Sequence, residues 1–83
     1  MTSSKKEFAI LEALRSAEPY MVPDASIFGD ANIRSSVPLS YTEFRRLLTD
    51  LEEQRRVVCV DGEDGRKWKI TDDGKARLTE LQA

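Results

Sequence analysis

The sequence predicts a small α+β domain that is mostly α, with three helices, a β-hairpin and a last helix. Two S-x-x-E strings, at Ser4 and Ser40, each precede apolar residues at helical spacing. A β-branched run at 57–60, a glycine-rich turn and an alternating segment at 66–70 together predict a hairpin. A chain of 83 residues has room for one core, so we expect a single domain over residues 1–83.

The first helix is expected to begin at Ser4, whose hydroxyl can accept a hydrogen bond from the Glu7 amide in a capping box. Pro19 ends this helix, because the residue before a proline is pushed out of the helical region. The apolar stripe of the helix consists of Phe8, Ile10, Leu11, Leu14 and Ala17. Residues 20–22 are apolar and lie between two prolines, which predicts a brief edge strand.

A second helix is predicted near residues 25–32, with Asp24 as its N-cap. Its inward positions are Ile27, Phe28 and Ala31. Gly29 weakens this helix by about 1 kcal/mol relative to alanine. A loop over residues 32–39 follows.

The third helix, at about residues 40–55, has the clearest amphipathic pattern. Ser40 and Glu43 form a second capping box. The inward stripe consists of Phe44, Leu47, Leu48 and Leu51, with Tyr41 one turn earlier. The outer positions are Thr42, Arg46, Thr49, Asp50 and Glu53, with Arg45 on one flank. Arg46 and Asp50 are spaced for an ion pair.

The hairpin places Trp68 and Ile70 on one face of its second strand, which favours a core position for Trp68. Cys59, among valines, is expected to be a small buried hydrophobe. Thr71 can cap a last helix at residues 72–82. Leu78 and Leu81 face inward on that helix, and Gly74 allows a close backbone approach.

Composition excludes most catalytic and metal chemistry. The chain has no histidine and one cysteine, so Ser-His-Asp and Cys-His pairs and the usual zinc ligand sets cannot form. No phosphate-binding glycine loop is present. We therefore expect no enzyme activity, no cofactor and no metal. The sequence has no apolar run long enough for a membrane span, and its one cysteine suits a reducing compartment, so we expect a cytoplasmic protein.

Three strings resemble the winged helix-turn-helix superfamily, as found in MarR-type and PadR-type regulators. Residues 51–58 (LEEQRRVV) look like the end of a third helix that runs into a first wing strand. Residues 61–65 (DGEDG) look like a wing tip, and residues 68–78 (WKITDDGKARL) are similar to the segment that follows the wing. The resemblance therefore implies a winged-helix fold.

The resemblance also implies a partner, duplex DNA. The third helix, about 40–55, would enter the major groove, and the wing, about 61–67, would follow the adjacent backbone. Arginine suits this role because its forked donors match guanine O6/N7 or a phosphate. The residues implied in DNA binding are Ser40, Thr42, Arg45, Arg46, Thr49, Arg66 and Lys67.

Several features leave a second interpretation open. Families of this type usually carry a glycine where Arg55 stands, so the third helix could end differently or continue for one turn. The loop at 33–39 exceeds the tight turn of a standard helix-turn-helix. The net charge of −2 and the acidic wing tip do not favour phosphate contact, and a protein-interaction module without DNA binding is the alternative. A homodimer through Leu78 and Leu81 would require that these two leucines are not buried in the core of their own chain.

Overall fold

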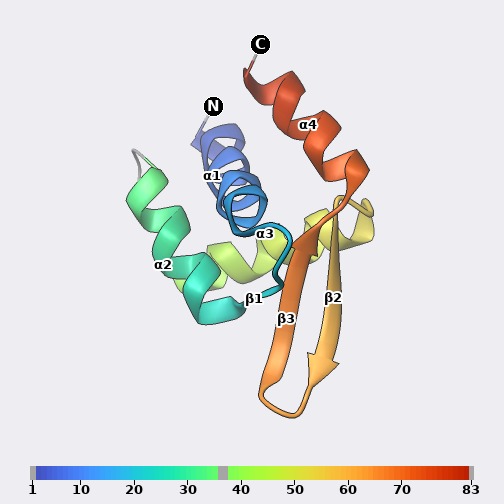
Figure 1. Ribbon diagram of the computed structural model, residues 1–83. Helices are drawn as coiled ribbons and strands as arrows, with labels where there is room; N and C mark the ends of the chain where they lie inside the picture. Colours follow the sequence, from blue (N-terminus) through green and yellow to red (C-terminus); the bar gives the residue numbers. More distant parts are fainter. Residues whose placement is uncertain (1, 36–37, 83) are drawn as a thin grey trace.

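The elements follow the predicted order. The computed structural model describes residues 2–35 and 38–82, so positions 36 and 37 of the predicted loop at 32–39 lie outside the described residues. The elements within the described residues are α1 (Thr2–Ala17), β1 (Val22–Pro23), α2 (Asp24–Arg34), α3 (Tyr41–Glu53), β2 (Val57–Gly62), β3 (Gly65–Ile70) and α4 (Asp72–Gln82), arranged as in Figure 1. The α+β class, mostly α, is confirmed.

Helix α1 forms the centre of the core, and α2 and α4 pack against it (Figure 1). Its buried apolar residues are Ala9, Ile10, Leu11, Ala13 and Leu14. The capping box predicted at Ser4 is wrong, because α1 already begins at Thr2 and Ser4 lies inside the helix. The Glu7 carboxylate instead accepts hydrogen bonds from Arg56 Nη1 at 3.2 Å and Arg77 Nε at 3.1 Å. Glu7 thereby connects α1 to the start of the hairpin and to α4.

The short strand β1 pairs antiparallel with β3, with Val22 opposite Trp68. An edge strand was expected here, and it lies at residues 22–23 instead of 20–22. The N-cap of α2 is Pro23, without a side-chain cap bond, and Asp24 is the first helical residue. The prediction that Asp24 caps α2 is therefore wrong. Its carboxylate accepts a hydrogen bond from Trp68 Nε1 instead.

Helix α3 begins as predicted, because the Ser40 hydroxyl accepts a hydrogen bond from the Glu43 amide at 3.2 Å. The reciprocal half of the capping box does not form. The Glu43 carboxylate pairs with Lys6 Nζ at 2.7 Å and so connects α3 to α1. The inward stripe is buried at Phe44, Leu48 and Leu51 and partly buried at Leu47.

Helix α3 ends with an arginine in the place where glycine is usual. Arg55 has a φ of 61°, in the left-handed region. The Arg56 amide donates to the Leu51 carbonyl and the Arg55 amide to the Glu52 carbonyl, each at 2.9 Å. These two bonds define a Schellman motif. Helix α3 therefore ends at the position where a glycine is usual and does not continue for another turn. The left-handed conformation of Arg55 costs a non-glycine residue about 1–2 kcal/mol.

The hairpin consists of β2 and β3, joined by Glu63 and Asp64. Its register runs from Val57 opposite Ile70 to Gly62 opposite Gly65, and the strand order in the sheet is β1-β3-β2. Trp68 is buried, as expected, whereas Cys59 is only half-buried. Figure 1 shows the hairpin extending well beyond the helices, with β2 at the outer edge of the sheet.

Helix α4 returns to the core as predicted. The Thr71 hydroxyl accepts a hydrogen bond from the Gly74 amide at 3.1 Å, which confirms the cap. A Cβ at Gly74 would lie 2.1 Å from the Arg56 carbonyl oxygen, which confirms the close approach. Leu78 is 3% exposed and Leu81 is partly buried against the same core, so the condition for a dimer through these two leucines is not met. No helix within the described residues is long and apolar enough to cross a membrane.

Candidate nucleic-acid interface

The outer face of α3 presents the predicted side chains. Thr42, Arg45, Arg46 and Thr49 are all exposed. The helix positions them there because Phe44, Leu48 and Leu51 bury its opposite face. The acidic Asp50 and Glu53 are exposed on the same helix, so the face carries charges of both signs.

Three predicted residues meet at the start of α3. Ser40, Thr42 and Arg46 line a shallow depression of about 280 Å³, together with Glu43. Among the described residues, Arg46 makes no ion pair, so the spacing to Asp50 is not used. An unpaired guanidinium beside the first amides of a helix forms a surface that suits a phosphate oxygen.

A second group forms around the Asp24 carboxylate, where α2, α3 and β3 meet. Arg66 Nη2 lies 3.4 Å from Asp24 Oδ2, and Arg45 Nη1 lies 4.0 Å from the same oxygen. The other oxygen, Oδ1, accepts the hydrogen bond from Trp68 Nε1. One carboxylate therefore holds the two predicted arginines of α3 and the wing on a common surface.

The guanidinium groups of the same two arginines also lie over aromatic rings. The Arg45 guanidinium lies 5.9 Å from the centre of the Tyr41 ring, and the Arg66 guanidinium lies 5.4 Å from the centre of the Trp68 ring. A hydrogen bond with Tyr41 raises the pKa of Arg45. Arg45 is therefore charged at every physiological pH, and the ring faces attract both guanidinium groups.

Lys67 and Thr49 are placed differently from the rest. Alternation along β3 places Lys67 on the opposite face of the hairpin from Arg66 and Trp68. The two predicted cations of the wing therefore do not act on one surface. The Thr49 hydroxyl donates to the Arg45 carbonyl at 2.9 Å, so its own helix already satisfies it.

Sequence reasoning missed the organising role of Asp24 and Tyr41. Asp24 had the pattern of a helix cap, and no sequence spacing connects it to Trp68, which is 44 residues away. Tyr41 packs edge-on against Phe28, with 5.3 Å between ring centres, and this contact also depends on the tertiary fold.

The described residues contain no group of three or more His, Cys, Asp or Glu side chains arranged to hold a metal ion. The free thiol of Cys59 is half-buried in β2. Burial, followed by the nearby Asp61 charge, raises the pKa of this thiol. Cys59 is therefore a poor nucleophile near neutral pH.

Comparison with known proteins identifies the fold. No family model matches the sequence, and no curated protein matches it. A solved structure described as "F93 from STIV, a winged-helix DNA-binding protein" superposes with a TM-score of 0.76 at 17% sequence identity. The match covers 90% of this chain and 80% of that chain. The chain therefore has a winged-helix fold, with β2 and β3 as its wing.

Proposed function

We propose that this winged-helix chain binds duplex DNA, with α3 in the major groove and the wing along the adjacent backbone. The observation that carries the proposal is the common surface of Arg45 and Arg66, which one carboxylate, Asp24, joins across α3 and the wing. The similarity to a solved winged-helix DNA-binding protein supports DNA as the partner.

Each predicted residue has a role in this geometry. Arg45 and Arg46 on the exposed face of α3 can reach guanine O6 and N7. The depression that Ser40, Thr42 and Arg46 line receives a backbone phosphate. Arg66 contacts the backbone beside α3. Thr49 supports the conformation of α3 through its bond to the Arg45 carbonyl, and Lys67 is a remote, non-specific cation.

The proposal includes a biological role. A single domain over residues 1–83 that reads DNA and catalyses no reaction acts as a transcriptional regulator in the cytoplasm. The sequence strings that resemble MarR-type and PadR-type regulators support this role. A homodimer would match a two-fold symmetric operator.

Salt dependence tests the proposal. Fluorescence anisotropy of a random-sequence duplex pool, titrated at ~50 and ~200 mM salt, should show binding that weakens at least ~10-fold at the higher salt. That slope follows from the release of counterions by several phosphate contacts. Absence of binding at ~50 mM salt would contradict the proposal.

A second candidate function is a protein-interaction module. Its support is the sequence pI of about 5.1 and the acidic wing tip of Asp61, Glu63 and Asp64, which suit a basic protein surface better than a phosphate backbone. Native mass spectrometry with a defined basic partner and no DNA affinity at low salt would favour this function.

A further inference from the structure

The wing has an open edge. In the sheet order β1-β3-β2, strand β2 pairs with β3 on one side and has no neighbour on the other within the described residues. This edge offers six residues, Val57–Gly62, whereas the opposite edge is the two-residue β1 with Pro23. An unpaired strand of this length is a ready template for another strand.

The side chains of β2 do not protect this edge. Val58 and Val60 are 44% and 53% exposed, and both lie on the outer face of the hairpin. Lysines on an edge strand often prevent it from pairing with another chain. Here the lysines are on β3 instead, with Lys69 opposite Val58 and Lys67 opposite Val60. A second strand would therefore cover apolar surface as well as backbone groups.

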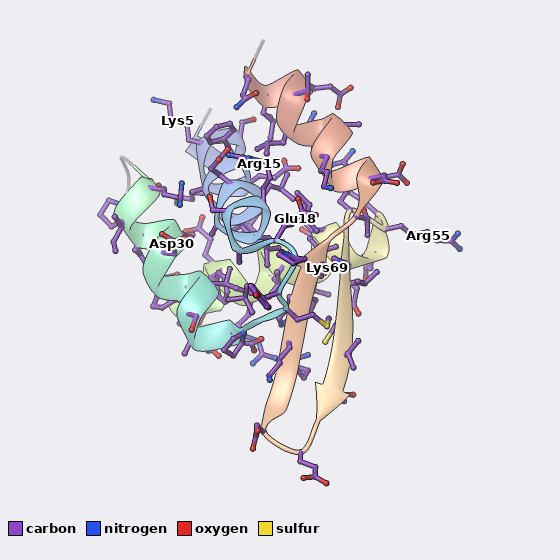
Figure 2. All side chains as sticks on the ribbon, viewed as in Figure 1. Lys5, Arg15, Glu18, Asp30, Arg55 and Lys69 are labelled. Carbon is purple, nitrogen blue, oxygen red and sulfur yellow. The ribbon has the colours of Figure 1, made fainter. Side chains whose placement is uncertain are left out.

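Arg55 stands at the base of this edge in a costly conformation. Its φ of 61° favours glycine, and no hydrogen bond or ion pair from another described residue holds its guanidinium. Figure 2 shows the side chain pointing away from the protein on the side of β2. The backbone of Arg55 is held within the chain, whereas its exposed guanidinium can contact another molecule.

The two ends of the strand carry opposite charges. Arg55 and Arg56 precede β2, and Asp61, Glu63 and Asp64 lie at its far end. A second β2 that runs antiparallel brings each basic end beside an acidic end. With Cys59 opposite Cys59, Val58 lies opposite Val60 of the second copy and Arg55 lies level with Glu63 of the second copy. Because the pairing is two-fold symmetric, every such contact occurs twice.

We propose that two copies of this chain associate through antiparallel pairing of their β2 edges, with Arg55 of each copy against the acidic wing tip of the other. The occupant is a second copy because the edge is complementary to itself in charge and in its two exposed valines. The hairpin extends beyond the helices, which leaves room for the helices of the second copy beyond the wing tip (Figure 1). Pairing also reduces the negative charge at each wing tip. The inference does not depend on DNA binding.

Sedimentation equilibrium of the full chain over concentrations up to on the order of 1 mM tests the proposal. The wild-type chain should approach twice the mass of one chain, 9.4 kDa. Arg55→Gly keeps a residue suited to the left-handed conformation and should raise the dimer Kd about 2- to 30-fold, because two exposed ion pairs are lost. Lys5→Gln removes an equal charge at the other end of the molecule (Figure 2) and should leave the Kd unchanged.

A charge exchange and amide hydrogen exchange complete the test. Glu63→Arg should weaken the dimer more than Arg55→Gly does, and combining Arg55→Glu with Glu63→Arg should restore it. Amides of β2 should exchange more slowly in the dimer than in the dilute monomer. The proposal is overturned if the chain is monomeric at every concentration, or if the Arg55 and Glu63 variants have the dimer Kd of the wild type. It is also overturned if a dimer forms without slower amide exchange in β2.

Discussion

The indole Nε1 of Trp68 donates a hydrogen bond to the carboxylate of Asp24, across 44 residues of sequence. The bond joins the start of α2 to the middle strand of the sheet. The other carboxylate oxygen faces Arg66 and Arg45, so the contact that fixes a core tryptophan also places two surface arginines. Packing of the fold and geometry of the candidate interface therefore depend on one side chain.

Asp24→Ala is expected to destabilise the chain by about 1–3 kcal/mol, because it leaves the N–H of a buried tryptophan without an acceptor. Asp24→Asn retains an oxygen acceptor and should destabilise the chain less than Asp24→Ala does. Urea denaturation followed by Trp68 fluorescence measures both free energies of unfolding. An Asp24→Ala chain as stable as the wild type would contradict this role of the bond.

Gly74→Ala is expected to destabilise the chain by about 1–3 kcal/mol, because a Cβ there meets the Arg56 carbonyl oxygen at 2.1 Å. Gly29→Ala is the matched control. Apart from the adjacent residues and the backbone of its own helix, nothing lies within 4 Å of a Cβ at Gly29, so alanine should stabilise α2 by about 0.5–1 kcal/mol. Opposite shifts of the two melting temperatures are expected, and equal shifts would rule out the close contact as their cause.

Cys59 gives the fold a pH dependence at alkaline pH. Burial raises the pKa of this thiol above its ordinary value of 9.0, so the unfolded chain ionises first as the pH rises. The resulting stability is complete below pH 9.0 and is lost as the pH rises through the folded-state pKa. Iodoacetamide alkylation of the folded chain should show a higher midpoint pH than alkylation in urea. An equal or lower midpoint would contradict the shift.

The order of elements could be predicted from the sequence because local signals agree with the fold. The Ser40 cap, the stripe of Phe44, Leu48 and Leu51, and the alternation of Trp68 with Ile70 each depend on nearby residues. Gly74 was also predictable, since it lies on the inward side of an amphipathic helix.

Local signals failed where a distant partner competes for the same side chain. Ser4 and Glu7 match a capping box, but Glu7 gains two arginine partners from the hairpin start and α4. Asp24 likewise matches a cap but bonds Trp68. The end of α3 at Arg55 shows the same limit, because the Thr71 hydroxyl, 16 residues away, donates to the Arg55 carbonyl and stabilises a conformation that the arginine alone disfavours.

The exposed face of α3 could be predicted from periodicity, but the grouping of its residues could not. Ser40, Thr42 and Arg46 gather at one depression, while Arg45 joins Arg66 at Asp24. This division depends on where the wing and α2 meet α3, which no spacing within α3 encodes.

The most direct test of DNA binding by α3 is the affinity of the double variant Arg45→Ala with Arg46→Ala for duplex DNA. Fluorescence anisotropy at ~50 mM salt should show a Kd at least ~10-fold higher than that of the wild type, because two cations that we propose to face the groove are lost. The melting temperature should change little, since both side chains are exposed, and Lys5→Ala should bind DNA as the wild type does. A double variant with wild-type affinity would contradict the assignment of α3 as the DNA-reading helix.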